Sequence, residues 1–190
     1  MNYDEGLIIT KQGDLQMKKP SKKSSVYRLC LTALFAALTA CLTIFPKIYI
    51  PGTTSGYVHL GDTIILLCAC ILPLPYAMAA GAIGGLLADI ISGVPIWAPF
   101  TFVIKALMIV AFSSKSEKII TKRNSLANIL YFVVTIGGYF FATWILYSYE
   151  SAVATNIWSL IQCVPSTALW FIIGAVFDKI NIKSKLKFIN

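Results

Sequence analysis

Long apolar runs alternate with short polar or proline-containing stretches along most of this chain. Six such runs can be drawn, at residues 29–45, 57–72, 76–91, 97–112, 126–149 and 152–177. A helix rises ~1.5 Å per residue, so roughly 20 mainly apolar residues cross the ~30 Å of hydrocarbon in a bilayer. The pattern predicts an all-α integral membrane protein, a bundle of six transmembrane helices.

Proline-containing turns separate three of these runs. Pro73 and Pro75 lie between the second and third runs, and Pro95 lies between the third and fourth. Proline has no N–H group and a fixed φ, so it stops a helix. We therefore expect two tight hairpins at these positions.

Composition supports the bilayer as the solvent of this protein. Of 190 residues, 57% are apolar and only 13% are charged, whereas soluble domains carry about 25% charged residues. Six spans leave no room for a separate catalytic domain. The cysteines show no metal-ligand spacing and are interpreted as small buried apolar residues; they are Cys30, Cys41, Cys68, Cys70 and Cys163.

The basic residues predict the orientation of the bundle. Six precede the first run, four lie between the fourth and fifth, and four follow the sixth, which accounts for 14 of the 16. With six spans, all three places fall on one side, and lysine and arginine are retained in the cytoplasm. We expect both termini in the cytoplasm of a multi-pass cell-membrane protein. The predicted parts are a basic tail at 1–27, the membrane domain at 28–180 and a second basic tail at 181–190.

The tail at the N-terminus has no apolar core or small-residue cleavage site, so it is not interpreted as a secretory signal. The net charge of +8 reflects topology. Nucleic-acid binding is a poor interpretation because the charges are scattered over short loops without a binding module.

The first run carries small residues one helical turn apart. Ala33 is spaced with Ala37, and Ala36 with Ala40. In lipid, such a face lets another helix approach closely. The neighbour is either another helix of the same bundle or a partner protein.

Three charged residues lie within or at the edge of the apolar runs. Intramembrane charges are costly and usually face the protein interior or water. Lys105 can pair with Asp89 or with Asp62 in a structural ion pair. Alternatively, Lys105 contacts an anionic or ring-acceptor substrate directly.

Aromatic and amide side chains gather near the outer ends of the last two runs. An aromatic belt explains many of them, but the amides of Asn156 and Gln162 need hydrogen-bond partners. Rings with a few polar groups suit a flat, hydrogen-bonding heterocycle. The single histidine, His59, cannot form a metal site alone; it either donates to a ligand or caps a helix. The predicted pocket consists of His59, Trp97, Lys105, Tyr139, Trp144, Asn156 and Gln162.

No cofactor or metal is predicted, and the chain has no phosphate-binding loop, serine elbow or metal signature. If this protein moves a solute uphill with ATP, the motor must be another protein. Two other hypotheses remain open. One is a self-sufficient secondary transporter, with Lys105 and Asp89 as coupling charges. The other is a small membrane enzyme, for which no nucleophile or acid–base pair is evident.

The alanine-rich first run is followed by GYVHLGD (56–62), GAIGGLLADIISG (81–93) and WAPFTFVIKAL (97–107). In this order the blocks resemble the substrate-capture (S) components of energy-coupling factor (ECF) transporters, in the branch grouped with riboflavin, pyridoxine and hydroxymethylpyrimidine importers. The first 23 residues lie outside the resemblance. It implies a six-helix bundle that binds one vitamin-class molecule from outside and catalyses nothing.

The resemblance also implies partners. An alanine face of the first helix would meet a transmembrane T component that carries two ATPases, and the S component would topple in the membrane to deliver its ligand. The tyrosine, tryptophan and amide side chains favour a small aromatic heterocycle, with pyridoxine or hydroxymethylpyrimidine ahead of riboflavin.

Overall fold

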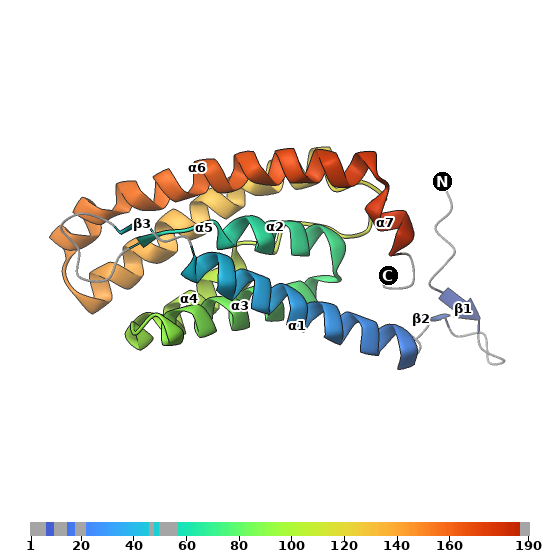
Figure 1. Cartoon of the computed structure of the whole chain (residues 1–190), viewed down its shortest axis with the longest axis horizontal. Coiled ribbons are helices and arrows are strands. Elements are labelled where there is room, and N and C mark those ends of the chain that lie inside the picture. The colour runs from blue at the N-terminus through green and yellow to red at the C-terminus, as the bar shows by residue number, and fades with distance from the viewer. Residues whose placement is uncertain (1–6, 10–14, 18–21, 46–47, 50–56, 187–190) are drawn as a thin grey trace.

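A computed structural model describes residues 7–9, 15–17, 22–45, 48–49 and 57–186 of the chain. It is built mainly from helices that run along the long axis of the molecule (Figure 1). The six main helices are α1 (Lys22–Ile44), α2 (Gly61–Ile71), α3 (Leu74–Ile91), α4 (Ala98–Leu107), α5 (Lys122–Leu146) and α6 (Tyr149–Lys179).

Shorter elements complete the described chain. A 3-10 turn, η1 (Pro95–Trp97), leads into α4, and α7 (Ile182–Lys185) follows α6. Two antiparallel strand pairs join β1 (Leu7–Ile9) to β2 (Leu15–Met17) and β3 (Ile48–Tyr49) to β4 (Tyr57–Val58). In the second pair, Ile48 is opposite Val58 and Tyr49 is opposite Tyr57.

The helices form a closed ring. α1 packs on α3, α3 on α4, α4 on α5 and α5 on α6, while α2 contacts both α6 and α1 and so closes the ring. The start of α1 and helix α7 lie at one end of the molecule, which we call the α7 end (Figure 1). β4 and the α5–α6 turn lie towards the opposite end, which we call the β4 end.

The fold is that of an integral membrane helical bundle. Within the described residues, four helices are long and apolar enough to cross a bilayer: α1 from Ser24 to Ile44, α3, α5 and α6. The two other apolar helices, Gly61–Ile71 and Pro95–Leu107, are shorter. The prediction of apolar helices at all six runs is confirmed, whereas the number of spans and their sidedness stay predictions.

The predicted ends of several elements differ from the observed ones. The second run was predicted to be helical from residue 57, but Tyr57 and Val58 pair with β3 and the helix begins at Gly61. The fourth run was predicted to be helical to residue 112, but α4 ends at Leu107 and a turn follows. At the N-terminal side, α1 begins at Lys22, within the predicted tail. The proline turn is where expected, because α3 begins directly after Pro73.

The short helix α2 lies at the centre of the packing. All of its residues except Ile64 are buried. It contacts α1, α3 and α6, and its side chains form much of the apolar core together with Met108, Ile109 and Trp170. Its first turn therefore lies inside the bundle, where polar groups need partners from neighbouring helices.

Glycines on α3 set the distance to two neighbours. A Cβ atom on Gly84 would lie 2.7 Å from the Ala36 carbonyl oxygen on α1, and one on Gly85 would lie 2.8 Å from Cγ2 of Thr101 on α4. Only glycine permits these close approaches. Because α3 packs closely on one face of α1, the alanines of α1 differ in exposure. Ala36 and Ala40 are buried, whereas Ala33 and Ala37 are exposed.

Candidate functional site

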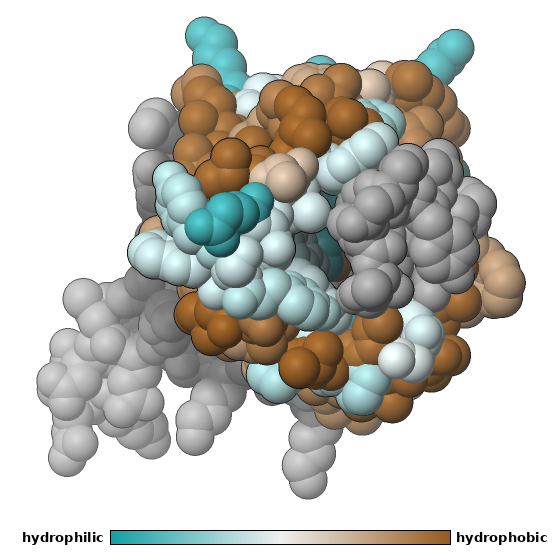
Figure 2. Space-filling view, turned by 90° about the vertical axis from the view of Figure 1, so that its left-hand side faces the viewer, coloured by the Kyte–Doolittle hydropathy of each residue, from teal (hydrophilic) through white to brown (hydrophobic). Residues whose placement is uncertain are grey.

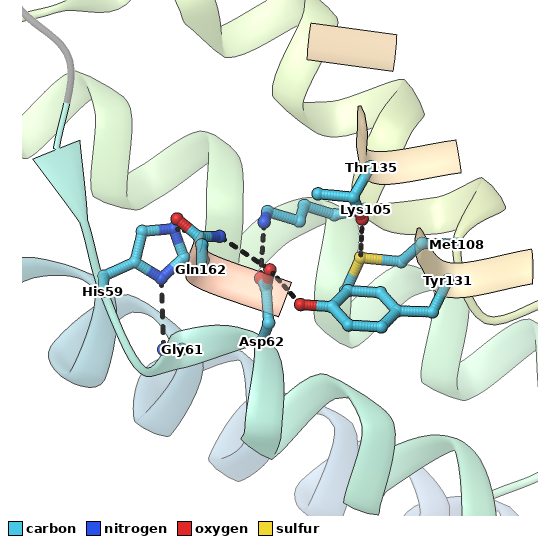
Figure 3. A network of polar contacts seen from close by, with 8 residues as sticks. All are labelled: His59, Gly61, Asp62, Lys105, Met108, Tyr131, Thr135 and Gln162. Carbon is cyan, nitrogen blue, oxygen red and sulfur yellow. Dashed lines mark hydrogen bonds and ion pairs between the residues drawn. The ribbon is translucent and has the colours of Figure 1, made fainter. Parts of the chain in front are cut away.

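A carboxylate in the first turn of α2 is the centre of a buried polar network (Figure 3). Asp62 is fully buried, and the Lys105 ammonium from α4 forms an ion pair with its Oδ1. On the other oxygen, Gln162 Nε2 from α6 donates a hydrogen bond of 2.7 Å, and the Tyr131 hydroxyl from α5 donates one of 3.0 Å. Four helices therefore meet at one carboxylate.

The network explains how two charges are tolerated inside the bundle. Burying a charge is expensive unless it is paired and its remaining hydrogen-bonding capacity is satisfied. Asp62 meets this condition through one cation and two neutral donors, and an acidic residue in the first turn of a helix also interacts favourably with the helix dipole. The charges of Asp62 and Lys105 cancel, so the ion pair adds no net charge to the site.

His59 shapes the turn that leads into α2. Its Nδ1 accepts a hydrogen bond of 3.1 Å from the Gly61 N–H, which places the ring proton of the neutral imidazole on Nε2. That nitrogen lies 3.4 Å from Gln162 Nε2. His59 therefore stabilises the start of the helix and also borders the Asp62 network.

Gly61, two residues after His59, is required by the packing of α1 against this turn. A Cβ atom on Gly61 would lie only 2.0 Å from the Thr43 Oγ1 of α1. In the GYVHLGD block, glycine allows α1 to approach, histidine holds the turn and aspartate binds the lysine.

An aromatic group continues from Lys105. The Lys105 Nζ lies 5.4 Å from the centre of the Tyr139 ring, and the Trp97 ring lies 6.2 Å from Tyr139 and 6.0 Å from Tyr147. Trp97 is positioned by η1, and the two tyrosines are on α5 or directly after it. Ring faces and the charged network thus form one continuous site.

The surface of the β4 end is hollowed near its centre, and hydrophilic atoms are visible below the rim (Figure 2).

The structure brings several predicted residues together and places others elsewhere. His59, Trp97, Lys105, Tyr139 and Gln162 belong to the network and its aromatic continuation. Trp144 instead lies among Phe140, Phe141 and Tyr149 and is 47% exposed.

Asn156 and Asp89 were also predicted to belong to the site or its ion pair. The Asn156 Oδ1 is buried and has no hydrogen-bond partner within the described part of the chain. Of the two carboxylates considered for Lys105, the structure shows the ion pair with Asp62. Asp89 is buried on α3.

Sequence reasoning missed Tyr131, which is fully buried and binds Asp62 directly. A signal was present, because Asn124, Asn128, Tyr131 and Thr135 recur at intervals of three or four residues. In a helix this spacing places them on one face, and all four are buried. Treating these four residues as one polar, buried face of the helix would have identified Tyr131 as a site residue.

A membrane bundle with a buried, charge-balanced polar network and adjoining ring faces has the features of a protein that binds a small solute. Among the described residues, no group of three or more histidine, cysteine, aspartate or glutamate side chains could hold a metal ion.

A family model described as "ECF-type riboflavin transporter, S component" matches residues 23–183. A protein of Pyrococcus woesei, described as an uncharacterized protein in a gap 3' region, is 33% identical over 139 residues, which cover 72% of this chain and 92% of the relative. The chain belongs to the family of ECF-type riboflavin transporter S components.

Membership confirms the resemblance seen in the sequence. The chain is a substrate-specific subunit of a membrane transporter and not an enzyme, and S components work with a T component and ATPases. The hypothesis of a small membrane enzyme is thereby excluded.

Proposed function

We propose that this protein captures a flat, uncharged heterocycle of the vitamin class from outside the cell membrane and delivers it inward with a T component and two ATPases. The observation that carries the proposal is the buried network of Asp62, Lys105, Gln162 and Tyr131 beside the rings of Trp97 and Tyr139.

The charge balance of the network favours an uncharged ligand. Lys105 already has a carboxylate partner, and a charged ligand would bring an uncompensated charge into a buried site, which is costly. The rings of Trp97, Tyr139 and Tyr147 offer faces on which a planar molecule can pack. The His59 ring, the Gln162 amide and the buried Asn156 Oδ1 supply polar groups that can orient it.

Several heterocycles meet these conditions. The sequence favours pyridoxine or hydroxymethylpyrimidine over riboflavin, whereas the description of the matched family names riboflavin. All three are uncharged or can bind in an uncharged form, so they form the first panel of ligands.

The direction of capture follows from the charge distribution. Exposed basic side chains lie at the α7 end, among them Lys115, Lys122 and Lys179, and lysine-rich loops stay in the cytoplasm. The β4 end, with its hollow (Figure 2), then faces outside and admits the ligand.

The contact with the T component involves α1 in this proposal. Ala36 and Ala40 are buried inside the bundle, whereas Ala33 and Ala37 are exposed one turn apart. A helix of a partner can approach closely only at small residues that are exposed. We therefore assign the partner contact to Ala33 and Ala37.

Thermal unfolding of the full chain in detergent, titrated with each compound of the panel, tests the proposal. A ligand that binds only the folded protein raises its stability with the logarithm of concentration above Kd. We expect a clear shift with one compound of the panel, and Trp97→Leu should abolish most of it.

Trp144→Leu is the matched control, because Trp144 lies in the separate aromatic cluster and its loss should leave the shift in place. A well-folded protein that responds to none of the three compounds would contradict the proposed ligand class. Equal loss in both tryptophan variants would contradict the proposed site.

A further inference from the structure

The segment between α4 and α5 is fastened to the C-terminal end of α6. The Asp178 carboxylate accepts a hydrogen bond of 2.6 Å from the Ile119 N–H and one of 3.0 Å from the Ile120 N–H. Gly174, one turn earlier, gives room for the Ile119 side chain, which would lie 3.1 Å from a Cβ atom there. One carboxylate thus fixes two consecutive peptide groups of the segment.

Two more buried side chains hold the same segment. Lys183 on α7 is only 5% exposed and donates a hydrogen bond of 2.7 Å to the Ser114 carbonyl oxygen. Asn124 is fully buried; its Oδ1 accepts from the Ser113 N–H, and its Nδ2 donates to the carbonyl oxygens of Ser113 and Ile119. The backbone of 113–120 is therefore fixed by side chains from α5, α6 and α7.

This fastened segment and the helix ends beside it present a set of exposed basic side chains. We call this set the basic rim; it consists of Lys115, Lys118, Lys122, Arg123, Lys179 and Lys185. Within the described segment 113–186, one acidic side chain at this end, Glu117, is exposed beside these six basic ones. The surface is strongly positive as a result.

The basic rim borders the apolar surface of the bundle. On α5, the exposed side chains of Leu126 and Ile129 follow Lys122 within two turns. On α6, exposed Ile172 and Val176 precede Lys179 in the same way. Where such apolar side chains meet the acyl chains, the basic side chains one turn beyond lie at the level of the lipid headgroups.

We propose that the basic rim is a preformed binding site for the phosphate groups of anionic phospholipids. Charge complementarity and continuity with the lipid-facing surface identify lipid as the occupant. The hydrogen bonds of Asp178, Lys183 and Asn124 hold the backbone of the segment that carries Lys115 and Lys118, so the loop does not have to be ordered when lipid binds.

The test uses the full chain purified in a neutral detergent and titrated with phosphatidylglycerol or phosphatidylcholine, with unfolding temperature and native mass spectrometry as readouts. We expect phosphatidylglycerol to be retained and to stabilise the protein more than phosphatidylcholine does. A third titration with inorganic phosphate distinguishes a lipid site from a general anion site. If phosphate alone gave the full effect, the proposal would be overturned.

Charge removal shows whether the rim is responsible. The double variant Lys115→Gln, Lys118→Gln should weaken the preference for phosphatidylglycerol by roughly 25-fold, since each basic residue near an anionic surface contributes about a factor of five. Glu150→Gln removes an exposed charge in the first turn of α6, next to the α5–α6 turn. It is the control and should leave the preference intact. An unchanged preference in the double variant would overturn the proposal.

Asp178→Asn distinguishes a preformed site from a diffuse positive field. This change makes the protein more positive, so a diffuse field predicts tighter binding of phosphatidylglycerol. A preformed site predicts weaker binding, because the asparagine NH₂ group that replaces one carboxylate oxygen cannot accept, so one of the two peptide N–H groups loses its partner. Tighter binding would contradict the proposal, provided that the variant unfolds cooperatively in phosphatidylcholine.

A protein partner is the other occupant that the charges could fit. If the double lysine variant keeps its phosphatidylglycerol preference but no longer co-purifies with the T component and ATPases, the rim binds protein and the lipid proposal is wrong. The vitamin-dependent shift is measured separately, so its failure and the failure of lipid binding are distinguishable.

Discussion

The Asp62 carboxylate receives contacts from side chains on three other helices, and this gives single residues unusual weight in the site. Lys105 neutralises it, and Gln162 and Tyr131 satisfy its second oxygen. A buried ion pair contributes little net stability compared with an apolar pair, yet breaking one is costly because the other charge is left unpaired. The network therefore fixes the geometry of the site more than it stabilises the fold.

Replacing either member of the ion pair tests this view. Asp62→Asn or Lys105→Met should each lower the free energy of unfolding by about 3–5 kcal/mol, because one buried charge remains. The double variant should be more stable than the less stable of the single variants. Denaturant unfolding in detergent measures all three and yields the coupling energy. Costs that simply add in the double variant would show that the two charges do not interact.

At the scale of elements, helix ends and close contacts place the site. Thr121 caps the N-terminus of α5, where its side chain accepts from the Asn124 N–H, and Ser148 caps the N-terminus of α6 by accepting from the Ser151 N–H. α2 is short because strand β4 takes up the residues before it, and its first turn therefore ends inside the bundle. That late start, at Gly61, is what brings Asp62 within reach of α4, α5 and α6.

Gly84 sets the distance between α1 and α3 and gives a second prediction. Gly84→Ala would place a Cβ atom 2.7 Å from the Ala36 carbonyl oxygen, so the helices must separate, at a cost of about 1–3 kcal/mol in unfolding free energy. Gly137→Ala on α5 is the control, since nothing lies within 4 Å of its Cβ position and alanine favours a helix by about 1 kcal/mol. Thermal unfolding of both variants measures the difference, and a Gly84→Ala protein as stable as the control would refute the close contact.

The whole molecule consists of a ring of helices with three differing surfaces. The sides of the bundle are apolar, with exposed residues such as Ile145, Val133 and Ile172. The β4 end is hollowed and partly hydrophilic (Figure 2), and the α7 end carries the basic rim. These surfaces suit lipid tails, an incoming ligand and lipid headgroups, respectively.

Assembly with the T component is a property of the whole molecule. Ala37→Leu, on the exposed face of α1, should strongly reduce co-purification with the T component and ATPases because a large side chain prevents close helix approach. The vitamin-dependent thermal shift of the isolated chain should persist. Ala154→Leu, exposed on α6, serves as the control. Normal assembly of the Ala37→Leu protein would move the contact to another surface.

Local patterns along the chain were sufficient to predict the class of fold and most helix positions. Apolar runs and prolines are local signals. They are interpreted from the thickness of the hydrocarbon layer and from the missing N–H of proline, and neither depends on the rest of the chain. The sequence also indicated that Asp62 and Lys105 needed partners. The alanine-rich first run and the GYVHLGD, GAIGGLLADIISG and WAPFTFVIKAL blocks, in this order, suggested the family that the comparison confirmed.

Which residues contact one another depends on how the helices assemble. Periodicity shows which face of a helix is buried, but the partner across that face depends on helix order, rotation and depth. Lys105 contacts Asp62 because α2 starts deep in the bundle, and Tyr131 joins them because α5 presents its polar face to the same point. For the same reason Ala36, rather than Ala37, packs against Gly84: the direction from which α3 crosses α1 is a property of the assembled bundle.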